Sequence, residues 1–129
     1  MKPISGLKLL DEREGAGASA KKGDRVVYNT RMFLNQGDEV PLNDLQAKQL
    51  PKEMVRVEAA VTFIDHSIVL GRRQAIAGVE HALMGMKFGG YRKVRVSPHL
   101  AYRDKGLMGL IPADAVLVVE LWLREIVER

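Results

Sequence analysis

Residues 70–117 read LGRRQAIAGVEHALMGMKFGGYRKVRVSPHLAYRDKGLMGLIPADAVL. The first part of this stretch predicts a helix over Gln74–Met86, since its apolar residues recur at helical spacing and form one stripe. Glu80 and His81 are expected on the opposite side, and Gly89-Gly90 is expected to end the helix, because glycine adopts positive φ without strain. The stripe consists of Ile76, Val79, Leu83 and Met86.

Strand patterns surround this helix. An edge strand is predicted over Gly6–Arg13, and turns at Lys22–Asp24 and Asn35–Asp38 enclose a strand over Arg25–Phe33. Alternating apolar and polar residues predict extended chain over Glu53–Leu70 with one wet face. Two further strands are predicted over Tyr91–Pro98 and Ala115–Ile126. The buried row of the last strand would be Leu117, Val119, Leu121 and Leu123.

A short helix is also predicted over Pro41–Leu50. Proline suits a first helical turn, Asn43 would act as the cap, and Pro51 would end the helix. Its buried side would consist of Leu42, Leu45 and Leu50. Five or six antiparallel strands with one central helix indicate an α+β fold in which a bent sheet wraps around the helix.

Length and composition favour one soluble domain over residues 1–129. The chain has no cysteine, which excludes disulfides and thiolate metal sites. No signal-like or membrane-spanning apolar run is found, so a cytoplasmic protein is expected. The net charge is +4, but no aromatic residues are interleaved with the basic groups, so nucleic-acid binding is not expected.

Two kinds of chemistry are also not expected. In Asp65-His66-Ser67, successive strand residues point to opposite faces, which argues against a catalytic triad. The histidines at 66, 81 and 99 lack metal-ligand spacing. Neither a metal nor a cofactor is predicted.

The block from Leu70 onward resembles the FKBP-type peptidyl-prolyl cis-trans isomerases. The resemblance extends over Gly6–Ile126 and is sharp after Leu70. It implies an FKBP-like fold, a bent antiparallel sheet of five or six strands around one helix. The matching residues are Leu70-Gly71, Ile76, Gly78, Leu83, Gly85-Met86, Gly89, Pro98, Ala101-Tyr102, Gly106, Ile111-Pro112, Ala115 and Leu117.

The resemblance also implies a site. Family members bind a proline side chain in an apolar pocket between helix and sheet, and the matching groups here are the N–H of Ile76 and the hydroxyl of Tyr102, which would hold substrate carbonyls. Rotation about X–Pro has a barrier of about 18–20 kcal/mol, because twisting breaks amide resonance. A dry pocket that prefers the twisted amide lowers this barrier without a covalent step or cofactor.

Much of the apolar lining departs from the family. Valine stands at Val79 and Val119 where the family has aromatic residues, and at Val40 where it has a phenylalanine. Asn29 corresponds to a family tyrosine, with Tyr28 one place away and so expected on the opposite face. Each loss of a ring forfeits roughly 1–2 kcal/mol of contact. The remaining substrate-binding positions are His66, in place of another phenylalanine, and Leu107, Leu110 and Ile111.

The segment between Val40 and Leu70 is about sixteen residues longer than in the compact family members, and the extra residues are assigned to 42–62. They are predicted to be an insertion. It would either pack beside the sheet or cover the pocket. In the second case apolar wall would come from Leu45, Leu50, Met54 or Phe63.

Two functions follow from the resemblance. The first is an isomerase, or rotamase, that acts weakly or narrowly on X–Pro bonds of polypeptides during protein folding. The second is a catalytically degenerate protein-binding or chaperone-like module, which would use the Arg103–Leu110 loop and its apolar tip Leu107-Met108. The missing rings also argue against binding of the family's macrolide ligands. Client identity and oligomeric state are left open.

Overall fold

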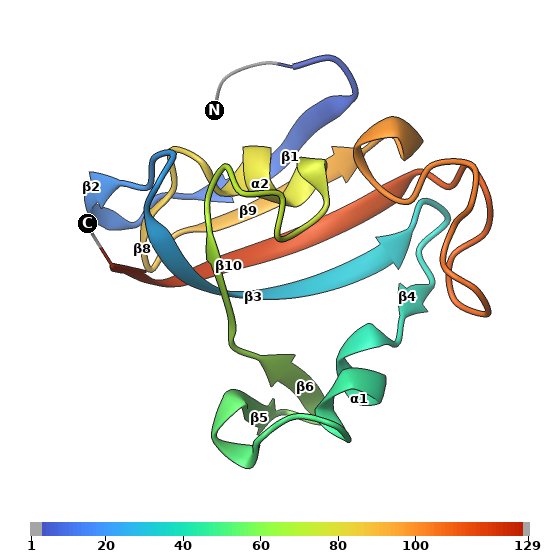
Figure 1. Cartoon of the computed structure of the whole chain (residues 1–129), viewed down its shortest axis with the longest axis horizontal. Coiled ribbons are helices and arrows are strands. Elements are labelled where there is room, and N and C mark those ends of the chain that lie inside the picture. Colours follow the sequence, from blue (N-terminus) through green and yellow to red (C-terminus); the bar gives the residue numbers. More distant parts are fainter. Residues whose placement is uncertain (1–3, 128–129) are drawn as a thin grey trace.

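The computed structural model of this chain describes residues 4–127 and shows a bent antiparallel sheet with one helix lying over it (Figure 1). The sheet has six strands, which confirms the α+β fold expected from the sequence. Five follow the order β1 (Leu7–Arg13), β9 (Tyr91–Val96), β10 (Leu117–Val127), β3 (Arg25–Leu34) and β4 (Glu39–Val40), and β7 (His66–Val69) also pairs with β3.

The core lies between this sheet and α2 (Ala77–Leu83). The predicted buried row of β10 is confirmed, since Leu117, Val119, Leu121 and Leu123 are each 0% exposed. Glycine at position 78 is required by the packing of α2, because a Cβ there would collide with Val96. The helix therefore lies close against β9, which positions the segment before it at the open end of the sheet.

α2 is shorter than the predicted helix Gln74–Met86. Ile76 has φ −58° and ψ 148°, and Met84 has ψ 131°, so both flanking residues are extended. The helix is followed by Gly85, whose φ is +86° and whose N–H donates to the Ala20 carbonyl at 2.8 Å. The expectation that Gly89-Gly90 ends the helix was wrong. Gly89 lies between β8 (Lys87–Phe88) and β9, with its N–H bonded to the Leu123 carbonyl at 2.9 Å.

Glu80 was expected on the wet side of the helix together with His81, and this was correct only for His81. Glu80 is 7% exposed, and its Oε1 atom has no hydrogen-bond partner within residues 4–127. The spacing of the apolar stripe placed Glu80 on the polar side of the helix, but its side chain is buried. A buried carboxylate oxygen without a donor is costly.

The segment Glu53–Leu70 is not one strand. A single-turn helix η1 (Lys52–Met54) precedes a separate hairpin of β5 (Val55–Glu58) and β6 (Val61–Ile64), and β7 then joins the main sheet. Ala59 and Ala60 form the turn with φ of +50° and +65°. Such turns are usually marked by asparagine or glycine. Two alanines gave no such signal, and the alternation of apolar residues continued through them.

The predicted helix before this hairpin exists as α1 (Leu42–Ala47), but its details differ. No side chain caps it, and the Asn43 side chain instead donates to the carbonyls of Thr30 at 2.8 Å and Thr62 at 3.1 Å. Leu45 is 45% exposed rather than buried. A further short strand, β2 (Ala16–Ser19), pairs with β8. Among residues 4–127, no helix has the length and apolar character needed to cross a membrane.

Candidate active site

A cavity of about 210 Å³ opens where β3, α1, the segment before α2 and the loop around Tyr102 meet. Four elements distant in the sequence thus contribute to one site. Of the residues proposed from the sequence, the cavity brings together Ile76, Tyr102, Val40, His66 and Val79. Much of the remaining lining comes from residues 74 and 75 and from Tyr28, Thr30 and Met32 of β3.

Ile76 presents a backbone donor to this cavity. Its carbonyl accepts the N–H groups of Val79 at 3.0 Å and Glu80 at 3.2 Å, which begins the helix. Its own N–H makes no hydrogen bond within the described part of the chain. The first amides of a helix lack intrahelical acceptors, so they are free to bond another group. The Ile76 N–H is therefore available to a carbonyl in the cavity.

Tyr102 supplies a second donor. It follows the single-turn helix η2 (Pro98–Leu100), and its carbonyl accepts the Gly106 N–H at 3.0 Å, which fixes the loop. Its hydroxyl makes no hydrogen bond to any residue in 4–127. Burial raises the pKa of this hydroxyl above its ordinary value of 10.0. The group is thus protonated at neutral pH and can donate to an acceptor.

Besides Tyr102, two rings line the cavity, His66 as proposed from the sequence and Tyr28, which was not expected there. Tyr28 and His66 stack with centroids 5.3 Å apart and an interplanar angle of 29°. Tyr28 was expected to face away, but it pairs with Leu123 in the register of β3 and β10 and so shares the core face. The in-phase series Val26, Tyr28, Thr30 and Met32 in the sequence was the signal that could have revealed this.

The electrostatics of these rings follow from their burial. Burial raises the pKa of Tyr28, and the nearby Tyr102 and Glu80 raise it further. Burial lowers the pKa of His66, against a smaller opposing effect of Asp65. Both rings are consequently uncharged at neutral pH. They form an apolar surface with polar edges.

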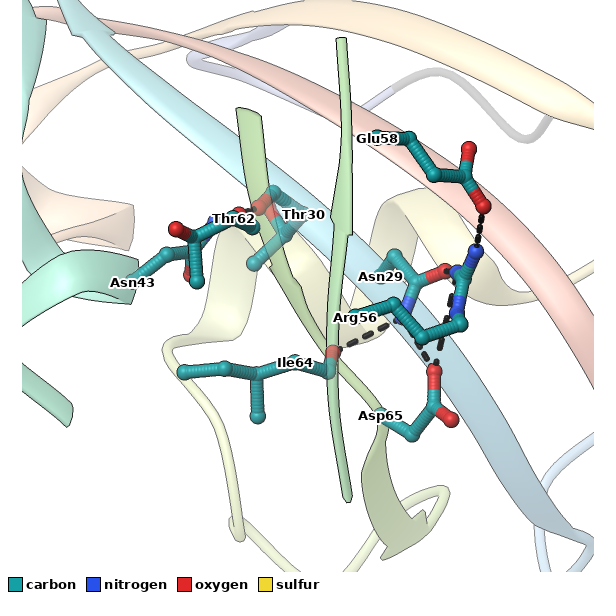
Figure 2. A network of polar contacts seen from close by, with 8 residues as sticks. All are labelled: Asn29, Thr30, Asn43, Arg56, Glu58, Thr62, Ile64 and Asp65. Atoms are coloured by element: carbon teal, nitrogen blue, oxygen red, sulfur yellow. Dashed lines mark hydrogen bonds and ion pairs between the residues drawn. The ribbon is translucent and has the colours of Figure 1, made fainter. Parts of the chain in front are cut away.

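Asn29 lies outside the cavity, on the other face of β3 from Tyr28, and Figure 2 shows the polar contacts around it. It is 1% exposed, and its Nδ2 donates to the Ile64 carbonyl at 2.8 Å and to Asp65 Oδ1 at 2.6 Å. Its Oδ1 accepts from Arg56 at 2.6 Å, and Arg56 also pairs with Glu58. We call Asn29, Arg56, Glu58, Ile64 and Asp65 the Asn29 network. It ties the β5–β6 hairpin to the sheet.

The other proposed wall residues do not line the cavity. Val119 and Ile111 are buried in the core at 0% and 5% exposure. Leu107 and Leu110 pack against the core from outside and are half-buried. Leu107 was also expected to be exposed at a loop tip with Met108. Instead its N–H donates to the Ile111 carbonyl, and its carbonyl accepts the N–H groups of Leu110 and Ile111. Of the two tip residues only Met108 is exposed, at 98%.

Residues 42–62 contact both the cavity and the sheet. Leu42, Asn43 and Gln46 of α1 line the cavity. The apolar residues proposed for that role do not, namely Leu45, Leu50, Met54 and Phe63. Phe63 instead packs edge-on against Trp122, with centroids 5.5 Å apart, on the face of Asn29. Within residues 4–127 no three histidine, cysteine or acidic side chains come together as metal ligands do.

Comparison with known proteins shows what the chain resembles. The family model described as FKBP-type peptidyl-prolyl cis-trans isomerase matches residues 17–124. FK506-binding protein 1A of Neurospora crassa is 28% identical over 118 residues, 91% of this chain and 85% of that protein. FK506-binding protein of Neisseria meningitidis serogroup B is 29% identical over 125 residues, 97% of this chain and 100% of that protein.

Longer proteins also match. FK506-binding protein 4 of Chaetomium thermophilum is 31% identical over 126 residues, which is 98% of this chain but only 22% of that protein. The chain therefore spans about a fifth of the length of this relative.

Proposed function

The chain belongs to the FKBP-type peptidyl-prolyl cis-trans isomerases, and from this premise we propose that X–Pro bonds of polypeptides are isomerised in the cavity between Ile76 and Tyr102. The observation that carries the proposal is a pair of free donors, the Ile76 N–H and the Tyr102 hydroxyl, in the cavity that Val40 and Val79 also line.

The mechanism requires only binding. The proline ring would lie against Val79, Val40 and Tyr28, out of water. The two donors would hold the carbonyls on either side of the rotating bond. Twisting removes amide resonance, so the twisted amide is less polar than the planar one. An apolar surface therefore disfavours the twisted amide less than it disfavours the planar amide. Preference for the twisted amide over the planar one lowers the barrier.

We propose that the activity is weak or narrow in its substrates. Val79 and Val40 occupy positions at the cavity where the resemblance implies rings, and each forfeits roughly 1–2 kcal/mol of contact. Tyr28 and His66 offset part of that loss, because both rings line the cavity. On the same grounds we expect FK506, for which the relatives are named, to bind weakly.

The test is an NMR exchange or protease-coupled assay on short peptides with varied residues before proline. Tyr102→Phe removes one hydrogen-bond donor and is expected to reduce kcat/KM about tenfold. Tyr91→Phe is the matched control, since its hydroxyl bonds to Glu120 at 2.6 Å and lies outside the cavity. A flat result across all peptides, or equal losses in the two variants, would contradict the proposal.

A second candidate function is a chaperone-like binding module, which the 98% exposure of Met108 favours. An exposed methionine at a loop tip suits weak contact with apolar segments of a client. Met108→Ser would reduce suppression of client aggregation and leave the peptide assay unchanged. We further propose that residues 1–129 act as one domain in the cytoplasm, and that residues 42–62 are an insertion relative to compact members.

A further inference from the structure

A second, larger depression adjoins the cavity. It has a volume of about 690 Å³ and lies along the outer side of α2, between the loop after β7 and the loop around Ala101. Both depressions are lined by Ala75, and Tyr102 of the cavity stands between Ala101 and Arg103 of the second. A polypeptide that leaves the cavity past Ala75 therefore enters this groove.

The groove is basic. Lys22, Arg73 and Arg103 line it, and all three are exposed. None of them forms a salt bridge with a carboxylate in the described residues. The two histidines His81 and His99 complete the polar rim. Three cations without protein partners face one open space.

The fold constrains the chain at each of these three cations. Lys22 packs its stem against Gly71, where there is no room for a Cβ. The Arg103 N–H donates to the Pro98 carbonyl at 2.9 Å, and its carbonyl accepts the Asp114 N–H at 2.8 Å. Arg73 and Arg103 both have a φ of +56°, a left-handed conformation that costs a non-glycine residue about 1–2 kcal/mol. Two arginines of the same groove thus both adopt this unfavourable backbone conformation.

Glu80 is the one acidic residue that lines the groove. Its Oε1 atom is buried and lacks a donor within the part of the chain that the structure describes. This oxygen is withdrawn from solvent, so the exposed charges of the groove are the three cations. The groove thus fits a segment that offers an anionic side chain to them.

We propose that the groove selects substrates that carry an acidic side chain within a few residues of the isomerised proline. The preference rests on the proposed isomerase function, since the cavity holds the proline while the groove holds the anion. Carboxylate and phosphate share this chemistry, and guanidinium groups bind both through paired hydrogen bonds. The occupant is therefore the flanking sequence of the same polypeptide, not a separate ligand.

The test compares peptides that differ only in glutamate or glutamine at one to three residues on either side of the proline, with a phosphoserine and serine pair as a second arm. At low salt, kcat/KM for the best-placed glutamate peptide is expected to exceed that of its glutamine partner about fivefold. High salt would reduce this ratio, because the contacts are exposed. The second arm shows whether phosphate is preferred to carboxylate.

Arg73→Gln and Arg103→Gln are each expected to lower the glutamate-to-glutamine ratio toward one. Lys52→Gln is the matched control, because it removes the same charge from an exposed site on η1, outside both depressions, and it should leave the ratio unchanged. Ratios near one for every position in the wild type, with the glutamine peptide still turned over, would overturn the groove and leave the isomerase intact.

If no peptide is turned over, the isomerase proposal fails, and the groove is then tested by binding alone. Titration with the glutamate peptide should shift the amide NMR signals of Arg73 and Arg103 at a lower concentration than the glutamine peptide does. Equal shifts with both peptides would overturn the inference.

Discussion

Tyr28 and Asn29 are neighbours in β3 but belong to two regions that differ in whether their polar groups are hydrogen-bonded. Asn29 contributes to a network in which its amide donates twice and accepts once, all within 2.8 Å. Tyr28 contributes to a cavity where the Ile76 N–H and the Tyr102 hydroxyl have no partner in residues 4–127. Satisfied groups hold the fold together, while free donors in a cavity are available to a ligand. Substitutions in the first region should therefore alter stability, and substitutions in the second should alter binding.

The largest effect is expected from Asn29→Ala, which leaves Arg56 and the Ile64 carbonyl without their buried partner. It should lower the free energy of unfolding by about 3 kcal/mol, as measured by denaturant unfolding. The kcat/KM of the molecules that remain folded should not fall with it. A selective loss of activity without a loss of stability would break the distinction between the two regions.

Val79→Trp tests the cavity by restoring an apolar ring at a lining position that is 1% exposed. Proline peptides should bind about tenfold more tightly, since a ring adds roughly 1–2 kcal/mol of contact. Affinity would be measured by NMR titration. Leu45→Trp is the control, because it adds the same ring at a site that is 45% exposed and outside the cavity. Equal gains in both variants would argue against the cavity as the proline site.

The alkaline stability of the protein should depend on Tyr28. Its pKa is raised by burial, so the folded protein keeps a proton that the unfolded chain releases above its ordinary value of 10.0. The free energy of unfolding should therefore fall as pH rises above 10, by up to about 1.4 kcal/mol per pH unit for this group. Tyr28→Phe should remove that share of the slope in denaturant unfolding at several pH values. An unchanged slope would contradict the assignment.

The smallest effects on the free energy of unfolding are expected from two glutamate substitutions, and they have opposite signs. Glu80→Gln removes a buried charge whose Oε1 has no donor among the described residues, and should raise the free energy of unfolding by about 1 kcal/mol. Glu58→Gln removes an exposed partner of Arg56 and should lower it by about 0.5 kcal/mol. Thermal unfolding of both variants measures the difference. A loss of stability in Glu80→Gln would mean that its carboxylate is already satisfied.

The sequence predicted the parts of the fold whose burial pattern is regular. The β10 row from Leu117 to Leu123 was identified because one-sided burial imposes strict alternation. The Ala59–Ala60 turn was missed because alanine carries no turn signal, and the hairpin was therefore read as one strand. These local signals cannot register a turn that tertiary packing imposes.

The candidate site was predicted in part. Ile76, Tyr102 and Val79 were identified from the resemblance and line the cavity. Asn29 was matched to the family tyrosine where Tyr28 faces the cavity, and a slip of one residue moves a strand side chain to the opposite face. The wall supplied by Leu42, Asn43 and Gln46 could not have been foreseen, since it depends on how α1 packs against β3.

The Asn43 side chain has a further consequence for the outer side of β3. β7 pairs with Arg25–Tyr28 and β4 with Met32–Phe33, so only Asn29 to Arg31 lie between them, and there Asn43 occupies the Thr30 carbonyl. An unpaired edge strand can pair with a strand of another molecule, which leads to aggregation. On this side the unpaired stretch is too short and too occupied for such pairing. The Asn43 amide thus closes the gap that β4 and β7 leave along this one edge of the sheet.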